Sequence, residues 1–382
     1  MPILFILIAA HSYVAWRLWP ALAAWPGAQW LLVAALVGSA VLMPLGFMAR
    51  RMRALKLSQS ASDALAWGGA LSMGWFSSTW VLTVLREPVL LAAWAAHVIG
   101  LDAVAPATIS VWTGVAVLLL SAVITLLGLW NARRSAAVVA VDVPIANLPE
   151  ALHGFRIAQI SDIHVGPTIK RGYVSAIVRS VNHLQADMVA VTGDLVDGSV
   201  ADLASHVAPL ADLESTHGTY FVTGNHEYYS GAHAWITELR RLGLTVLMNQ
   251  HVVLQHGAAA LLVAGVADHG AHHFDAQHRS DPQAALLGAP LAATVRVLLA
   301  HQPRSAEAAE KAGFDLQLSG HTHGGQFWPW NHFVRLQQPF TAGLHRWEKL
   351  WVYTSRGTGY WGPPKRLGAP SEITHLRLVC AA

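Results

Sequence analysis

Residues 157–164 read IAQISDIH, a short apolar run that ends in two polar residues, Asp162 and His164. A run of this composition is typical of a buried strand, and the polar residues come where that strand would end. In open α/β sheets, active sites lie at such strand ends. Similar clusters recur along the chain. The five clusters are Asp162-Ile163-His164, Gly193-Asp194-Leu195-Val196-Asp197, Gly224-Asn225-His226-Glu227, His301 and Gly320-His321-Thr322-His323.

The other four clusters also follow apolar runs, which are Met188–Val191, Tyr220–Val222, Val295–Leu299 and Leu316–Leu318. We therefore expect buried strands that bring these side chains together at one edge of a sheet. Asp, Asn and His side chains suit Mn²⁺, Zn²⁺ or Fe and suit Cu⁺ poorly. Taken singly, an Asp-x-His triplet arises by chance, a lone histidine is usually structural, and a glycine can belong to a turn. Five such clusters in order, each ending a strand, indicate one two-metal site.

The first 130 residues hold only six of the 25 Lys and Arg residues and three of the 22 Asp and Glu residues. The formal charge of +3 therefore belongs to this part, and it does not indicate nucleic-acid binding. We predict an all-α transmembrane region over residues 1–134. Its four spans are expected at about residues 3–19, 29–49, 64–85 and 107–130, each close to the ~20 residues that a bilayer requires. Residues 3–19 lack the charged start and small-residue cleavage site of a signal peptide.

Two features refine this region. Arg86-Glu87-Pro88 interrupts the apolar sequence after the third span, and residues 89–99 are too few to cross alone, so they form a helical extension or an interfacial segment. The basic residues at 50–56 and at 133–134 indicate the cytoplasmic side by the positive-inside rule. We therefore predict a multi-pass protein of the inner (cytoplasmic) membrane whose soluble domain faces the cytoplasm. The single cysteine, Cys380, excludes an internal disulfide.

The soluble part, residues 136–382, alternates strand-like and helix-like stretches, which fits a two-layer or three-layer α/β sandwich. A strand with a connector is expected over Ala137–Pro149. Helices are expected at Gly172–Leu184, Ala201–Leu213, Ala232–Leu242 and Pro303–Gly313, and later strands at Val252–Leu254, Ala260–Val266 and Trp351–Thr354.

The clusters Asp-x-His, Gly-Asp-x-x-Asp, Gly-Asn-His-Glu, a lone His and Gly-His-Thr-His resemble those of the calcineurin-like metallophosphoesterase superfamily. This resemblance covers nearly all of residues 150–382 and implies an αββα sandwich carrying two metal ions. Residues 316–326 (LQLSGHTHGGQ) and 355–359 (SRGTG) are similar to a membrane-associated bacterial branch. Its neighbours include phosphodiesterases and pyrophosphohydrolases that cleave UDP-2,3-diacylglucosamine.

The resemblance also implies a role for each polar residue. One metal would be held by Asp162, His164 and His323, the other by Asn225, His301 and His321, and the Asp194 carboxylate would bridge both. His226 would face the scissile phosphate as a catalytic residue, with Asp197 orienting it; the alternative is a histidine outside the metal shell with no catalytic role. Asn225, His226 and Arg356 are the candidate substrate-binding residues. The cofactors would be two divalent ions of Mn, Zn or Fe, which generate a hydroxide nucleophile near neutral pH.

Two further stretches have more than one interpretation. Asp268–His278 is rich in histidine and is a substrate contact, a third metal site or a solvated loop. Phe327–Arg366 carries five tryptophans and a formal charge of +5, from six basic residues against Glu348. It forms either a membrane-facing or substrate-facing wall of the site or a distant solvated face.

Taken together, the sequence predicts a membrane-anchored metallophosphoesterase that cleaves a phosphodiester or pyrophosphate bond, of a lipid-linked or nucleotide-linked substrate. We expect the protein to contact membrane lipid and to have no nucleic-acid partner and no obligate protein partner. One alternative is an enzyme for a soluble substrate that uses its spans only as an anchor. Another is a membrane transporter or sensor whose phosphoesterase domain is a regulatory binding module. The complete metal motifs disfavour an inactive domain, and the spans offer few polar groups for conduction.

Overall fold

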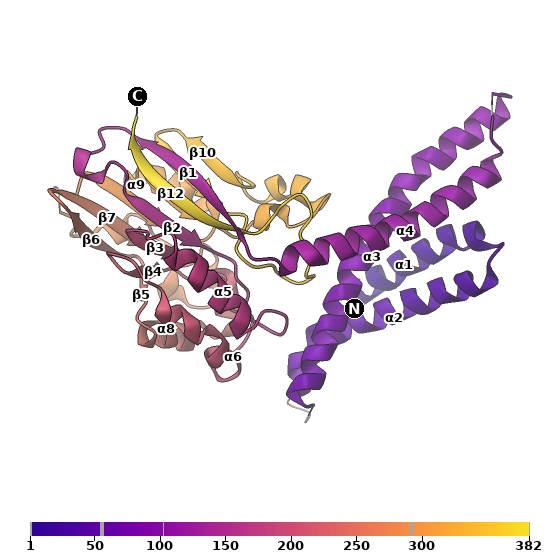
Figure 1. The fold of residues 1–382 in the computed structure, drawn as a ribbon, viewed down its shortest axis with the longest axis horizontal. Helices are drawn as coiled ribbons and strands as arrows, with labels where there is room; N and C mark the ends of the chain where they lie inside the picture. Colours follow the sequence, from indigo (N-terminus) through magenta and orange to yellow (C-terminus); the bar gives the residue numbers. More distant parts are fainter. Residues whose placement is uncertain (1, 54–56, 102, 291–292, 382) are drawn as a thin grey trace. The chain divides into compact units, whose positions relative to one another are not determined.

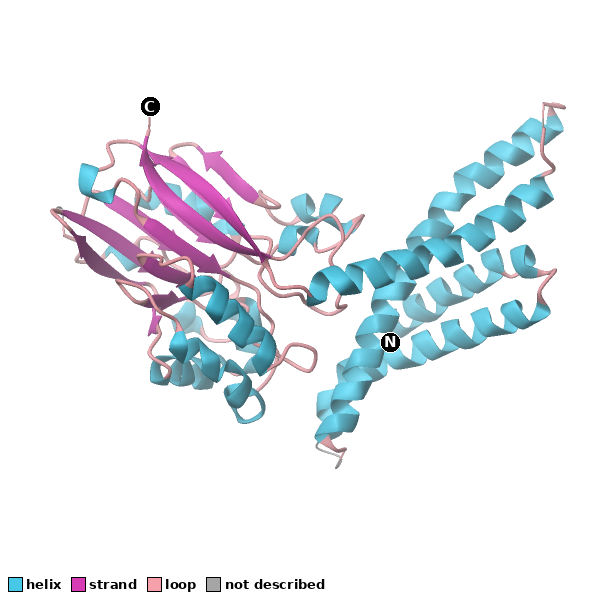
Figure 2. Ribbon diagram, in the orientation of Figure 1, coloured by secondary structure: helices cyan, strands magenta, loops and turns pink. Residues whose placement is uncertain are grey.

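The computed structural model describes residues 2–53, 57–101, 103–290 and 293–381 (Figures 1 and 2). The chain divides into two compact units. The helical unit comprises residues 1–130 together with 362–365, and the α/β unit comprises residues 131–361 and 366–382. Lys56 of the basic cluster at 50–56 lies outside the described residues.

The helical unit contains four main helices within the described residues: α1 (Pro2–Leu18), α2 (Pro26–Arg53), α3 (Gln59–Val98) and α4 (Pro106–Arg133). Three stretches are long and apolar enough to cross a membrane, namely Pro26–Ala49, Gln59–Val98 and Pro106–Arg133. The fourth candidate, Leu4–Leu18 of α1, is apolar but shorter. Each predicted span therefore coincides with a helix, and three of the four reach spanning length.

Helix α3 runs through Arg86-Glu87-Pro88 without a break, so residues 89–98 are the helical extension that was one of the two predicted alternatives. At ~1.5 Å per residue, its 40 residues exceed the ~30 Å thickness of a bilayer core. Its charges have partners inside the helical unit. The Arg86 guanidinium donates to the Ser110 carbonyl at 2.8 Å and to the Arg17 carbonyl at 2.9 Å, and Glu87 forms an ion pair with Arg17. Such pairing offsets the high cost of charged groups among apolar helices.

The α/β unit is built on two six-stranded sheets within the described residues (Figure 1). Four neighbouring strands run parallel in each sheet. In the first sheet they adjoin a parallel pair of the opposite direction, and in the second both edge strands are antiparallel. The first sheet has the order β1 (Ala137–Ile145), β12 (Glu372–Cys380), β2 (Arg156–Ile160), β3 (Met188–Val191), β4 (Thr219–Phe221), β5 (Thr245–Val246). The second has the order β10 (Gly343–Trp347), β11 (Leu350–Thr354), β9 (Leu316–Ser319), β8 (Val295–Leu299), β7 (Ala259–Gly265), β6 (Gln250–His256).

Alternation along the strands produces four layers. In β3, Val189 and Val191 face the helical layer, whereas Met188 and Ala190 face the second sheet. The first helical layer consists of α5 (Arg171–Asn182), α6 (Val200–Val207) and α8 (Ala232–Arg241), and α9 (Ala306–Ala312) packs on the outer face of the second sheet. Because a strand exposes alternate residues to opposite faces, a fully apolar strand must be covered on both sides. The predicted αββα sandwich and its N-terminal helical region are confirmed.

The predicted elements of the α/β unit lie within a few residues of the observed ones. The expected helix at Ala201–Leu213 is α6 followed by a 3₁₀ turn, Ala208–Asp212, and the one at Pro303–Gly313 is a 3₁₀ turn, Pro303–Ser305, followed by α9. Strands β5, β10 and β12 were not predicted, nor was α7 (Asn225–Ser230), which begins inside the third polar cluster.

Candidate metal centre

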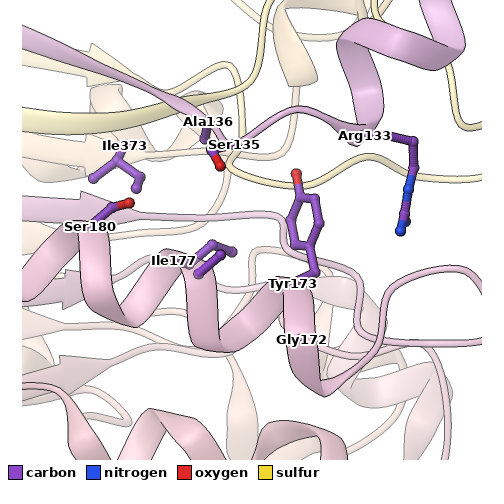
Figure 3. A pocket seen from close by; sticks show the side chains of 9 residues that line it. Arg133, Ser135, Ala136, Gly172, Tyr173, Ile177, Ser180 and Ile373 are labelled. Atoms are coloured by element: carbon purple, nitrogen blue, oxygen red, sulfur yellow. The ribbon is translucent and has the colours of Figure 1, made fainter.

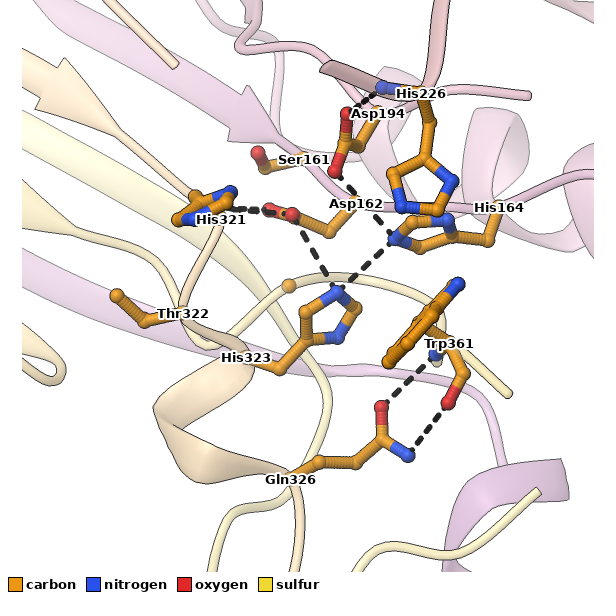
Figure 4. A network of polar contacts seen from close by, with 12 residues as sticks. Ser161, Asp162, His164, Asp194, His226, His321, Thr322, His323, Gln326 and Trp361 are labelled. Atoms are coloured by element: carbon orange, nitrogen blue, oxygen red, sulfur yellow. Dashed lines mark hydrogen bonds and ion pairs between the residues drawn. The ribbon is translucent and has the colours of Figure 1, made fainter. Parts of the chain in front are cut away.

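The five polar clusters follow the carboxyl ends of β2, β3, β4, β8 and β9 and converge on one place. Figure 4 shows residues of four of these clusters. The first group of ligand atoms comes from Asp162, His164 and His323, all of them buried. The Nε2 atoms of His164 and His323 are 3.0 Å apart, and His323 Nε2 is 3.5 Å from Asp162 Oδ1. These three side chains therefore direct their ligand atoms at one point.

The second group comes from Asp194, His301 and His321. Asp194 Oδ2 lies 3.2 Å from His301 Nε2, and His301 Nε2 lies 3.2 Å from His321 Nδ1. The same Asp194 oxygen is 3.9 Å from His164 Nε2 in the first group. Asp194 thus lies between the two groups, within reach of both.

The backbone is held in an uncommon conformation at the candidate ligands. Five of them have positive φ angles, from 50° at Asp194 to 69° at His321. This left-handed region is uncommon for non-glycine residues, although Asp and His tolerate it better than most. It turns the chain sharply where each strand ends. Such strained positions cluster at functional sites. The five are Asp162, His164, Asp194, His321 and His323.

Two glycines permit the close approach of neighbouring loops. A Cβ atom on Gly320 would lie 2.1 Å from Asp162 Oδ2 and 2.0 Å from Ser161 Oγ. A Cβ atom on Gly224 would lie 2.2 Å from Asp194 Oδ1. Both separations are far below van der Waals contact, so these two positions require glycine if the carboxylates are to stay where they are.

Hydrogen bonds outside the centre fix the histidine rings. His301 Nδ1 donates to the Thr192 carbonyl at 2.7 Å, and His164 Nδ1 donates to Asp197 Oδ1 at 3.1 Å. With the proton on Nδ1, each Nε2 presents its lone pair to the centre, as in the carboxylate–histidine arrangements of metalloproteins. Asp197 Oδ1 also accepts from His226 Nδ1 at 2.6 Å, which leaves His226 Nε2 directed away from Asp197.

The protonation of the histidines differs across the site. Burial lowers the pKa of His321 to about 3 and holds the pKa of His323 well below its usual value, so both rings are neutral and able to bind a cation. Burial would also lower the pKa of His226, but the Asp197 hydrogen bond and the charges of Asp194 and Asp197 raise it to about 9. At neutral pH, His226 is therefore a proton donor, whereas His321 and His323 are acceptors.

The sequence predicts no individual role for two residues that support the centre, although one of them, Trp361, lies in the predicted wall at 327–366. Glu227 is fully buried and accepts from the backbone N–H groups of Gly224, Asp194 and Leu195 at 2.6, 3.0 and 2.8 Å. It thereby joins the second and third clusters. Trp361 is 46% exposed, and its ring lies 5.8 Å from that of His226. The Gln326 side chain holds the Trp361 backbone through two hydrogen bonds of 2.9 Å (Figure 4). The position of Glu227 at the end of the Gly-Asn-His-Glu motif was the sequence signal that could have identified it.

The prediction that basic side chains of residues 327–366 face lipid or substrate is wrong for two residues. Lys365 and Arg366 are each only 1% exposed, so neither presents its charge to lipid or substrate. Lys365 belongs to the helical unit and donates to the Gly74 carbonyl at 2.9 Å. Arg366 donates to the carbonyls of His323 at 2.8 Å and Arg356 at 2.7 Å, and to His323 Nδ1 at 3.1 Å. Arg366 thus fixes both the backbone and the ring of His323 from a buried position.

Arg356, the predicted phosphate contact, forms an ion pair with Glu372 at 2.7 Å, and 34% of its side chain remains exposed. A Cβ atom on Gly324 would lie 3.1 Å from Arg356 Cγ, so Arg356 packs beside the residue that follows His323.

The residues fit a pair of divalent cations. The carboxylates Asp162 and Asp194 are buried with four histidines around them, and buried charges of this kind are paired or coordinate metals. The Asn225 side-chain oxygen is buried and has no hydrogen-bond partner among the described residues. It lies between Gly224 and His226, and the His226 N–H donates to Asp194 Oδ1 at 2.8 Å. A cation shared with Asp194 would supply the partner that this oxygen lacks.

A pocket of about 230 Å³ lies elsewhere in the α/β unit (Figure 3). Arg133, Tyr173 and Ile373 are among its lining residues, and no candidate ligand lines it. Arg133 donates to the Thr168 carbonyl at 2.9 Å. The pocket is therefore separate from the candidate metal centre in its lining residues.

Comparison with known proteins agrees with this geometry. Residues 155–325 match the family model described as calcineurin-like phosphoesterase. An uncharacterised metallophosphoesterase of Aquifex aeolicus is 33% identical over 220 residues, which cover 57% of this chain and 82% of that protein. The chain belongs to the calcineurin-like phosphoesterase family. The α/β unit is thus its metallophosphoesterase domain.

Two longer relatives of this chain are both named "transmembrane protein with metallophosphoesterase domain". The Bos taurus protein is 42% identical over 276 residues, covering 69% of this chain and 62% of its own length. The Danio rerio protein is 39% identical over 269 residues, covering 68% and 61%. The chain therefore spans about three fifths of the length of these two relatives. Their names and the three long apolar helices agree with a membrane location.

The contact at Gly320 yields a prediction for metal binding. In Gly320→Ala, the added methyl group would collide with Asp162 Oδ2, so the loop must move and the first ligand group must open. We expect the variant to lose most of its bound metal, measured by elemental analysis of the purified chain. The matched control is Gly172→Ala on the exposed first turn of α5, where nothing lies within 4 Å of the new Cβ. Full metal content in Gly320→Ala would contradict the close approach described here.

Proposed function

We propose that this chain is a membrane-anchored phosphohydrolase that depends on two divalent metal ions and cleaves a phosphodiester or pyrophosphate bond. The observation that carries the proposal is Asp194 Oδ2, which lies 3.2 Å from His301 Nε2 and 3.9 Å from His164 Nε2. A carboxylate with one oxygen within reach of histidines from both groups suits a bridging ligand of a two-metal hydrolase.

In this proposal, Asp162, His164 and His323 hold one ion, Asn225, His301 and His321 hold the other, and Asp194 binds both. Bound together, two divalent ions supply positive charge for a phosphoryl group and acidify water to a pKa near neutral. The protein's own contribution is to hold the ligands rigidly. The Thr192 carbonyl and Asp197 set the tautomers of His301 and His164, and Glu227 fixes the loops that carry Asp194 and Asn225.

His226 is the proposed catalytic acid. Its Nδ1 is held by Asp197, whose hydrogen bond and charge raise the pKa of the ring and favour its protonated form. A protonated Nε2 can donate to a phosphoryl oxygen or protonate the leaving group, a role that typically contributes about 10²–10⁴-fold in rate. Asp197 orients His226 and His164 at the same time, so it acts on the reaction through both rings.

Two aromatic side chains border His226. The exposed rings of Tyr229 and Trp361 lie 5.2 and 5.8 Å from the His226 ring. We propose that they contact the organic part of the substrate. Arg356 remains the proposed contact for a phosphate oxygen, because its partly exposed guanidinium packs beside the loop after His323.

The substrate class follows from chemistry and location. Two cations and a protonated histidine favour a phosphate ester or pyrophosphate, and membrane anchoring favours a substrate linked to lipid or nucleotide. We propose that the protein lies in the inner (cytoplasmic) membrane and that its catalytic domain faces the cytoplasm. Its support is the basic sequence at 133–134 after the last span.

Replacing His226 tests the assignment of acid and ligands. We expect His226→Gln to keep both metal ions and to lose about 10²–10⁴-fold in turnover of a chromogenic phosphodiester. Elemental analysis and steady-state kinetics on the same sample measure the two effects. The control is Asp194→Asn, in which metal and turnover should fall together. Metal loss in His226→Gln would make it a ligand, and unchanged turnover would remove it from the reaction. No hydrolysis of any phosphate ester by the metal-loaded wild type would favour a binding module instead.

Reporter fusions test the orientation. A fusion at Met52 and one at Ser135 should both report the cytoplasm, and one at Asp102 the opposite side, because α3 and α4 each cross once between these positions. A reporter pair of opposite compartment preference, such as alkaline phosphatase and green fluorescent protein, gives an internal control at each site. A periplasmic signal at Ser135 would contradict the cytoplasmic location.

A further inference from the structure

A second cluster of ligand-type side chains lies outside the dinuclear centre. His233, Asp275 and His278 offer ligand atoms that all lie within 4.8 Å of one another. Three other such groups occur among the described residues, and each of them contains Asp162 or Asp194. The cluster at His233 shares no residue with them. It joins the first turn of α8 to the loop that follows β7.

The three side chains point at one another. Asp275 Oδ2 is 2.9 Å from His233 Nε2 and 3.9 Å from His278 Nε2, and the two imidazole rings are 4.9 Å apart. Ligand atoms around a tetrahedral zinc ion with bonds of 2.0–2.1 Å are roughly 3.3 Å apart. The two observed separations bracket this value. A His233–Asp275 hydrogen bond alone would not account for His278 Nε2, which is beyond hydrogen-bond distance from the same oxygen.

The remaining polar atoms of the cluster are held from outside. His278 Nδ1 is 2.9 Å from the Tyr228 hydroxyl, and Asp275 Oδ1 accepts from the Gln277 N–H at 2.9 Å. A partner on Nδ1 fixes the ring and leaves Nε2 for a metal, which is the common arrangement of histidine ligands. His278 Nε2 and Asp275 Oδ2 are thus oriented toward the space beside His233.

We propose that His233, Asp275 and His278 bind a zinc ion that is separate from the dinuclear centre. Two imidazole nitrogens and one carboxylate are the donors that Zn²⁺ commonly takes, with water as the fourth ligand. The His233 side chain is 75% exposed, so the ion can enter from solvent without opening the fold.

The ion would hold a loop that has little regular structure. Between Asp268 and His278 the chain forms only two short 3₁₀ turns, Ala271–His273 and Ala276–His278. Phe274, next to Asp275, lies 5.5 Å from the Tyr229 ring, and Tyr229 lies 5.2 Å from the His226 ring. Zinc at this cluster would therefore fix the aromatic wall beside His226 in place. Its role is structural, acting on the active site through Phe274 and Tyr229.

Zinc stoichiometry tests the proposal. The detergent-purified full-length chain is freed of metal with a chelator, reloaded with Zn²⁺, and passed through a desalting column before elemental analysis. We expect about three zinc ions per wild-type chain and about two in His233→Asn and in Asp275→Asn. The control is His273→Asn in the same loop, which lies outside the cluster and should retain about three. His233 is an exposed helix residue, so its replacement leaves the fold intact.

The zinc count also depends on how fully the dinuclear centre is occupied. Repeating the comparison in an Asp194→Asn background removes this dependence. There, His233→Asn should still remove one zinc ion per chain, whatever the occupancy of the dinuclear site. A second readout is limited proteolysis of the loop, which zinc should slow in wild type and in His273→Asn but not in His233→Asn. Equal zinc content in wild type, His233→Asn and Asp275→Asn would overturn the proposal and leave the dinuclear assignment untouched.

Discussion

The carboxylate of Asp194 is the constraint on which the rest of the site depends. It is buried just beyond the carboxyl end of β3. Its Oδ1 accepts from the His226 N–H at 2.8 Å, and its Oδ2 faces His301 at 3.2 Å and His164 at 3.9 Å. A buried charge without compensation is strongly destabilising. Asp194 is therefore stabilised by positive charge, and His301 and His164 lie where they could share a cation with it.

The architecture follows from that requirement. Parallel strands of two sheets bring their carboxyl ends to one edge, and left-handed backbone at the candidate ligands turns each side chain inward. Glycines at 224 and 320 allow neighbouring loops to approach the carboxylates more closely than any other residue would permit. Glu227 and Arg366 then brace the loops from behind through backbone hydrogen bonds. Local strain and close contact are tolerated because a fully packed core surrounds the strands.

The sequence predicted the elements that depend on a local pattern of residues. It did not predict features that depend on contacts between residues far apart in the chain. Buried strands that end in polar clusters are visible as apolar runs, and the αββα sandwich followed from the resemblance that these clusters carry. Strand β12 was missed because Thr374, His375 and Arg377 interrupt its apolar pattern, although it pairs with both β1 and β2 in the first sheet. The Arg86 side chain of α3 is placed by carbonyl groups far along the chain, those of Arg17 and Ser110. Arg366 looked exposed because its carbonyl partners are also set by the fold. Tertiary contacts of this kind leave no periodic signal.

Electron paramagnetic resonance of the Mn²⁺-loaded protein tests the central claim, that Asp194 joins two metal sites, most directly. Two Mn²⁺ ions bridged by one carboxylate at roughly 3.5–4 Å are magnetically coupled. The account predicts the broad multiline spectrum of a coupled pair in wild type and its disappearance in Asp194→Asn. A simple six-line spectrum of isolated Mn²⁺ at full loading of wild type would contradict it.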